Sequence, residues 1–147
     1  LTSSLWGAGV VRVVTMTTTE TPTSVADETV AVVDAYLAAW NETDPAARRA
    51  LIEGALGGDL WYRDPLLEAD GLDAFDAMLA GVQQQFAGLV MRRTSPIDGH
   101  RDLVRFHWAF GAPGAEPAIA CLDGAKLDAD GKLHRIIGYT PETIPGA

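Results

Sequence analysis

The stretch Trp61-Tyr62-Arg63-Asp64-Pro65 predicts a short strand that ends in a carboxylate. Side chains alternate along a strand, so Leu60, Tyr62 and Asp64 should share one face. Pro65 cannot donate to a neighbouring strand and therefore marks a sheet edge or the strand end. Amphipathic helices are expected on both sides of this stretch, so Asp64 would lie at the rim or in the wall of a pocket if the strands curl around them. The simpler interpretation of Asp64 is a surface residue that opens a turn.

The composition is that of a globular protein. The chain has 147 residues, of which 48% are hydrophobic and 21% charged, and this suits one domain with a sizeable core. A formal net charge of −9 argues against nucleic acid and anionic membranes as partners. The single cysteine excludes an internal disulfide framework, and the three histidines have no recognised metal-ligand spacing. No apolar run reaches the roughly 18 residues that a membrane span needs.

The N-terminal segment differs from the rest. Residues 1–14 are apolar, with Arg12 as their only charge, and Met16 follows in a Thr-rich run. A secretory signal would carry positive charge ahead of its apolar core. We therefore expect residues 1–23 to be a flexible leader or the result of a mis-set translation start, with Met16 as the natural first residue. Residues 24–147 are expected to form a single domain of a cytoplasmic protein.

Hydrophobic periodicity predicts three helices and a set of later strands. The helices should cover residues 24–41, residues from 44 to between 54 and 58, and residues 70–88, with Asp44 and Asp70 as caps. Strands should follow the Tyr62 strand at 89–94, 103–110, 118–127 and 133–139, with a hairpin turn at 128–131. This order of elements indicates the α+β class.

Two further polar residues are candidates for chemistry. Tyr36 borders the buried stripe of the first helix and can project its hydroxyl into the interior. Asp123 stands on an otherwise apolar strand face, so it is either on a bulge beside Gly124 or buried at a cost of several kcal/mol. Together with Asp64 they suggest proton abstraction beside a carbonyl: one carboxylate takes the proton, while a phenol and a neutral acid donate hydrogen bonds to the enolate oxygen.

Four segments carry a resemblance to a known family. These are Tyr36-Leu37-Ala38-Ala39-Trp40-Asn41, Asp64-Pro65, Cys121-Leu122-Asp123 and the hairpin Asp130-Gly131-Lys132. With the order of elements, they resemble the nuclear-transport-factor-2-like superfamily, which includes SnoaL-like polyketide cyclases, limonene epoxide hydrolase and ketosteroid isomerase. The first three segments fall where the isomerase has its catalytic tyrosine, its base and its protonated aspartate. Cys121 stands where the hydrolase has an Arg, which argues against water activation by that hydrolase's triad.

The resemblance covers about residues 25–139 and implies both a shape and an activity. The shape is a cone, a curved mixed sheet wrapped around three N-terminal helices, in a homodimer joined through its sheets. The activity is cofactor-independent enolate chemistry on a small apolar carbonyl compound, like that of ketosteroid Δ5-isomerase, with Tyr36, Asp64 and Asp123 as catalytic residues. The alternatives are a SnoaL-like polyketide cyclase or a non-catalytic homodimeric module that binds an apolar ligand. Five aromatic residues are candidate pocket walls, although each also suits a plain core: Trp40, Trp61, Phe86, Phe106 and Trp108.

Overall fold

The computed structural model describes residues 25–140, so the predicted leader over residues 1–23 lies outside the described residues. The described elements are, in chain order, α2 (Asp27–Asn41), α3 (Pro45–Ala55), β1 (Leu56–Arg63), β2 (Glu68–Asp70), α4 (Leu72–Gln85), β3 (Val90–Arg93), β4 (Asp98–His100), β5 (Leu103–Gly111), β6 (Ile119–Leu127) and β7 (Leu133–Tyr139).

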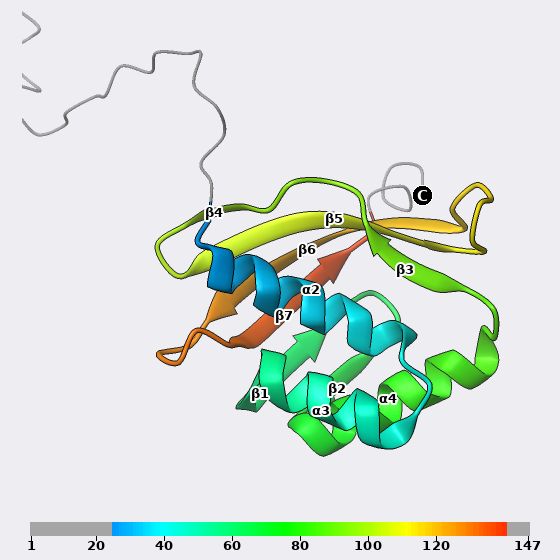
Figure 1. Ribbon diagram of the computed structural model, residues 1–147, viewed down its shortest axis with the longest axis horizontal. Helices are drawn as coiled ribbons and strands as arrows, with labels where there is room; N and C mark the ends of the chain where they lie inside the picture. Colours follow the sequence, from blue (N-terminus) through cyan, green and yellow to red (C-terminus); the bar gives the residue numbers. More distant parts are fainter. Residues whose placement is uncertain (1–24, 141–147) are drawn as a thin grey trace, which may run out of the picture.

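The seven strands form one curved sheet with the helices on one side (Figure 1). The strand order is β2-β1-β7-β6-β5-β3, and β4 pairs with β5 outside this path. The pairing of β1 with β7 is parallel, whereas the other pairings described are antiparallel. The α+β class and the mixed sheet curved around three helices are therefore confirmed.

The second helix ends at Ala55, within its predicted end. β1 begins at Leu56, earlier than the stretch at residues 61–65 indicated, and the short strands β2 and β4 were not predicted. Three-residue strands carry no periodic pattern, and these two exist because they pair with β1 and β5. Asp70 does not cap α4, because Gly71 is the N-cap residue, with a φ of 89° that favours glycine. The cap at Asp44 is confirmed, since its side chain accepts from the Ala47 amide at 2.9 Å.

The core lies between the helices and the inner face of the sheet. Val33, Leu37 and Trp40 of α2 are buried, as their helical spacing predicts. β5 alternates between buried and exposed residues over its first half, as expected for a strand with one face on a core. The aromatic rings of Tyr36, Trp40, Tyr62 and Phe75 pack into one cluster. The hydroxyl groups of Tyr36 and Tyr62 donate to Asp123 and Asp64, so both carboxyl groups lie beside this cluster.

The C-terminal end of α2 is fixed to the edge strand β3. The Asn41 side chain donates to the Met91 carbonyl at 2.8 Å and accepts from the Met91 amide at 2.7 Å. It therefore pairs with β3 much as a neighbouring strand would. This contact holds Trp40, the preceding residue, between α2 and the sheet.

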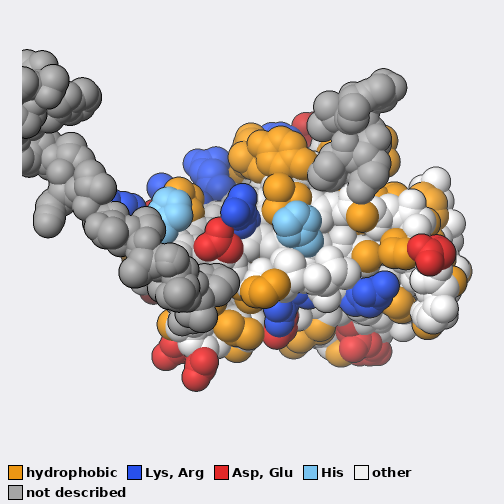
Figure 2. All heavy atoms as spheres, turned by 90° about the horizontal axis from the view of Figure 1, so that it is seen from above, with side chains coloured by type: hydrophobic (Ala, Val, Ile, Leu, Met, Phe, Trp, Pro, Cys, Tyr) orange, Lys and Arg blue, Asp and Glu red, His pale blue; other side chains and the backbone are white. Residues whose placement is uncertain are grey.

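The outer face of the sheet carries a mixture of side chains. Figure 2 shows apolar, basic and histidine side chains side by side on the surface seen from above. Leu103, Ile137 and Tyr139 are the exposed large apolar residues of β5 and β7. None of the described helices is long and apolar enough to cross a membrane.

Candidate active site

Asp64 follows β1 directly and forms the turn to β2. Its Oδ1 accepts from the backbone amides of Leu66 and Leu67, both at 2.7 Å. Its Oδ2 accepts from the Tyr62 hydroxyl at 2.6 Å. Asp64 thus has the turn-forming role of the simpler interpretation, and it also lies in the wall of a pocket.

This pocket is an apolar cavity of about 510 Å³, a size typical of small-molecule sites. Its wall is formed by α2, the β1–β2 turn, α4, β3, β5, β6 and the end of β7. The lining residues are Trp40, Asp64, Pro65, Leu66, Leu67, Val82, Phe86, Met91, Trp108, Phe110, Pro117, Ala118, Ile119, Ala120, Cys121, Gly138, Tyr139 and Thr140. Asp64 is the single ionisable carboxylate among these lining residues. A ligand in this cavity would therefore meet one anionic group in an otherwise apolar wall.

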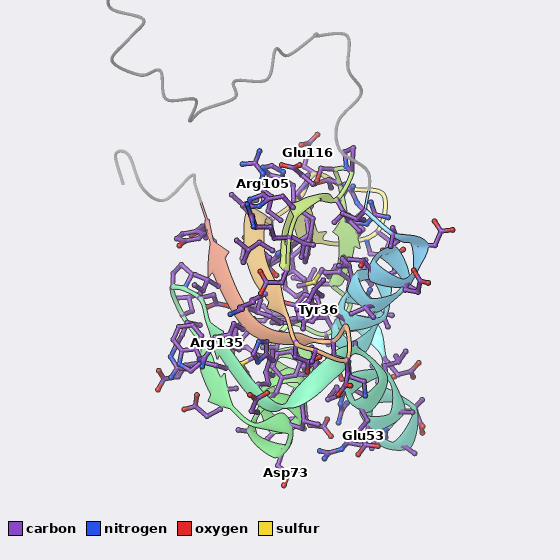
Figure 3. The ribbon with its side chains drawn as sticks, turned by 90° about the vertical axis from the view of Figure 1, so that its left-hand side faces the viewer. Tyr36, Glu53, Asp73, Arg105, Glu116 and Arg135 are labelled. Atoms are coloured by element: carbon purple, nitrogen blue, oxygen red, sulfur yellow. The ribbon has the colours of Figure 1, made fainter. Side chains whose placement is uncertain are left out.

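Asp123 is fully buried, which decides between the two interpretations of this residue. β6 runs through it in regular register, with Phe106 opposite on β5 and Gly138 opposite on β7, so there is no bulge at this position. The Tyr36 hydroxyl donates to Asp123 Oδ2 at 2.8 Å. Figure 3 shows Tyr36 in the interior between the helices and the sheet, whereas Arg105 and Arg135 lie at the periphery.

Burial changes the acidity of this pair. Loss of solvation is the main cause that raises the pKa of Asp123 to about 7. The Trp108 indole N–H and the Tyr36 hydroxyl lower this pKa, and the charge of Asp64 raises it by a smaller amount. Burial, with the nearby charge of Asp123, also raises the pKa of Tyr36 well above its usual value. Asp123 is therefore a candidate for a carboxyl group that stays protonated in weakly acidic solution.

Gly138 separates the two carboxyl-bearing residues. A Cβ atom at this position would lie 2.9 Å from Asp123 Oδ1 and 3.1 Å from the Cβ of Asp64. A side chain there would clash with both, so the absence of one allows Asp64 and Asp123 to approach from either side of β7. Gly138 also lines the pocket.

The predicted pocket residues fall into two groups. Trp40, Phe86 and Trp108 line the cavity. Phe106 instead packs edge-on against Tyr36, with 6.2 Å between the ring centroids. Trp61 lies away from the cavity, where the guanidinium groups of Arg63 and Arg135 approach its ring to 4.5 and 5.6 Å.

Of the three predicted catalytic residues, Asp64 alone lines the cavity. Tyr36 and Asp123 contact each other behind the wall, and both are fully buried. Tyr62 and Gly138 also help to form the site, although neither was predicted to. The spacing of Tyr62 and Asp64, two residues apart at a strand end, could have suggested their hydrogen bond, but nothing local marks the role of Gly138.

Comparisons with known proteins agree with the fold. No family model and no curated protein sequence matches this chain. The structure of a proposed isomerase of the SnoaL-like family from Agrobacterium tumefaciens has 29% sequence identity and a TM-score of 0.73, over 78% of this chain and 98% of that chain.

Two more distant structures share the fold at lower identity. A proposed polyketide cyclase from Sinorhizobium meliloti has 16% identity and a TM-score of 0.58, over 74% of this chain and 93% of that one. An LEH-like epoxide hydrolase from M. tuberculosis has 17% identity and a TM-score of 0.55, over 77% of this chain and 82% of that one. With its helices packed inside a curved mixed sheet, the chain belongs to the nuclear-transport-factor-2-like superfamily and groups with its SnoaL-like proteins.

Proposed function

We propose that this protein is a cofactor-independent enzyme that removes a proton from an apolar carbonyl compound and stabilises the resulting enolate, as a ketosteroid isomerase does. The observation that carries this proposal is the position of Asp64, a carboxylate in the wall of an apolar cavity of about 510 Å³. The buried acid Asp123 lies behind the same wall, next to Gly138.

Asp64 is the proposed base. A carboxylate offers about four lone-pair sites. Two backbone amides occupy Oδ1 and the Tyr62 hydroxyl takes one site on Oδ2, which leaves one site on Oδ2 for the proton. Asp64 would take a proton from the carbon next to the carbonyl and return it to another carbon of the same ligand, so the reaction is an isomerisation with no net loss of atoms.

Asp123 is the proposed donor to the enolate oxygen. Its Oδ2 already accepts from Tyr36, so a proton on Oδ1 is available for donation, and Oδ1 faces Gly138. The resemblance assigns Tyr36 a direct contact with substrate. Because the Tyr36 hydroxyl donates to Asp123, we propose that Tyr36 acts as a positioning residue through Asp123.

A different observation favours the alternative, a module that binds an apolar ligand without turnover. Three hydrogen bonds to Asp64 build the β1–β2 turn, which is a sufficient structural reason for this residue. In that case the cavity would bind its ligand through apolar contacts alone. A polyketide cyclase would use the same base, with the enolate carbon forming a ring bond instead of regaining a proton.

The experiment is incubation with a β,γ-unsaturated 3-ketosteroid, followed by the absorbance of the conjugated enone. Asp64→Asn should lower the rate by roughly 10²- to 10⁴-fold, because the amide cannot accept the proton. Asp130→Asn, an exposed residue of the β6–β7 turn, is the matched control and should keep the wild-type rate. Full activity of Asp64→Asn would reduce Asp64 to a turn residue, and binding without turnover would support the binding module.

We also propose that two copies associate through the outer face of the sheet. The exposed apolar side chains of Leu103 and Ile137 on this face support the proposal, since apolar surface favours association. The resemblance implies the same homodimer.

A further inference from the structure

The outer face of the sheet contains a second hollow, of about 640 Å³, formed by β4, β5, β6 and β7. Gly124 lies in its lining, and a Cβ atom there would meet nothing within 4 Å, so the space above this residue is open. Three cationic side chains and a single carboxylate also line the hollow: Arg105, Lys126, Arg135 and Asp98. The whole chain carries a formal net charge of −9, so the charge of this hollow is opposite in sign to that of the protein. A concave surface lined by cations attracts anions.

Two of these cations stand directly opposite each other on neighbouring strands. Lys126 of β6 is in register with Arg135 of β7, and both side chains are exposed. Like charges at directly opposite positions destabilise a sheet. Arg105 of β5 is opposite Gly124, which lies two residues before Lys126 on the same face of β6. The three cations therefore surround the open space above Gly124.

Neighbouring carboxylates balance this charge only in part. Asp98 accepts from Arg105 at 2.9 Å, whereas Asp102 is 3.7 Å from Lys126. Within residues 25–140, Arg135 forms no ion pair, and its guanidinium lies 5.6 Å from the centre of the Trp61 ring. The ring therefore orients a cation whose charge no carboxylate of this part of the chain offsets.

A phosphoryl group matches the chemistry of this hollow. It carries a charge of about −1.5 to −2 at neutral pH and has three strong acceptor oxygens. Arginine binds phosphate through parallel N–H···O bonds, and lysine adds a point charge. Leu103 and Ile137 are exposed apolar residues in the same lining, so an apolar body attached to the phosphoryl group would have a surface to pack on.

We propose that this hollow binds a phosphoryl group, as free phosphate or as a phosphate monoester with an apolar body, through Arg105, Lys126 and Arg135. The site is separate from the cavity at Asp64, since no residue lines both, and it goes beyond the proposed enzymatic function. The same face is proposed above for the association of two copies. A two-fold contact uses the same surface of both copies, so a bound dianion would offset the repulsion between their cations.

The test is calorimetry with inorganic phosphate and with phenyl phosphate at about pH 8, where both are mainly dianions, against sodium chloride of equal ionic strength. Both phosphates should bind saturably, and tighter binding of phenyl phosphate would assign the site to a monoester, whereas equal binding would assign it to free phosphate. Arg135→Gln should weaken binding by roughly tenfold or more, because a charge-assisted contact is lost. Arg92→Gln is the matched control, an exposed arginine of β3 outside the hollow, and should bind as the wild type does.

The backbone ¹⁵N–¹H signal of Gly124 in the wild-type protein gives a second measurement that does not depend on the folding of a variant. It should move with phosphate and stay in place with chloride. Binding no tighter than that of chloride, equal binding by Arg135→Gln and Arg92→Gln, or an unmoved Gly124 signal would overturn the proposal. Asp64→Asn should bind phosphate as the wild type does, so failure of the proposed catalysis and failure of this site are separate results.

Discussion

Asp123 holds a carboxyl group in the sheet interior, where ionisation would leave a charge away from solvent. Its pKa is raised from 3.8 to about 7, mainly by burial. Tyr36 and Asp64 also act on the pKa of Asp123. Burial, together with the charge of Asp123, raises the pKa values of Tyr36 and Tyr62 well above their usual value. The two phenols therefore stay neutral over the range in which Asp123 titrates.

This shift predicts a pH dependence of stability. Below about pH 3.8 Asp123 is protonated in both the folded and the unfolded chain, so its ionisation does not lower the free energy of unfolding. Between about 3.8 and 7 the unfolded chain ionises while the folded chain keeps its proton, so stability falls by at most about 1.4 kcal/mol per pH unit. Above about pH 7 Asp123 is ionised in both states, and the free energy of unfolding falls no further on its account. Urea unfolding of wild type and Asp123→Asn across this range should show a wild-type decline that the variant lacks, and parallel curves would contradict the buried acid.

Gly138 offers a steric test of the same site. In Gly138→Ala the new methyl group would meet Asp123 Oδ1 at 2.9 Å and the Asp64 Cβ at 3.1 Å, so at least one carboxyl group must move. We expect lower stability and slower turnover of the β,γ-unsaturated 3-ketosteroid, measured by urea unfolding and enone absorbance. Gly124→Ala is the matched control on β6, because a Cβ there meets nothing within 4 Å. Equal behaviour of the two variants would show that the contact does not constrain the site.

At the scale of elements, the parallel pairing of β1 with β7 brings the site together. The register places Arg63 beside Ile137, so the next residues along each strand, Asp64 and Gly138, lie side by side. The antiparallel pairing of β6 with β7 then places Asp123 opposite Gly138. Two residues that are 59 positions apart in the sequence thus meet across one glycine because three strands are adjacent.

The helices are joined by one buried cation. Arg48 of α3 donates to Asp76 at 2.6 Å and to the Gln83 side chain at 3.0 Å, both on α4, and its exposed fraction is 7%. Gln83 in turn donates to the carbonyls of Trp40 and Glu42 at the end of α2, both at 2.9 Å. This network fixes the helix that carries Trp40 relative to α4, which carries part of the cavity wall.

Removal of this cation should destabilise the helical layer. Arg48→Ala leaves Asp76 and Gln83 without their partner, and we expect the free energy of unfolding to fall by about 2–3 kcal/mol. This value is at the lower end for a broken buried ion pair because Asp76 is partly exposed. Arg49→Ala removes the adjacent arginine, which contacts Glu53 and Asp73 at the surface and Asp76 only at 3.8 Å, and should change stability much less. Urea unfolding measures both. Similar losses would mean that the network is not a stabilising element.

For the whole molecule, association through the outer sheet face predicts a dimer in solution. Ile137→Glu places a charge on this face and should shift the protein toward the monomer in sedimentation experiments. Ala38→Glu introduces the same charge at an exposed position of α2 and should keep the dimer. A wild-type monomer at micromolar concentration, or a dimer that survives Ile137→Glu, would contradict the proposed interface.

Local chemistry determined much of the fold. The helical spacing of Val33, Leu37 and Trp40 and the alternation along β5 require one buried face each, so any compact structure must turn these faces inward. The hairpin between β6 and β7 also follows from its residues, since Asp128 accepts from two amides of the turn and Gly131 has a φ of 81°. These signals depend on residues close together in the chain, and for this reason they can be detected in the sequence.

The tertiary structure alone decided the site. The sequence left Asp123 between a bulge and burial, and only pairing with β5 and β7 on either side excludes the bulge and keeps water away from its carboxyl group. The hydrogen bond between Tyr36 and Asp123 joins residues 87 positions apart, and no local pattern specifies it. The sequence supplied the three polar groups, while strand order and register determined which of them reaches the cavity. Desolvation and distance depend on every neighbour in space, and a linear pattern contains neither.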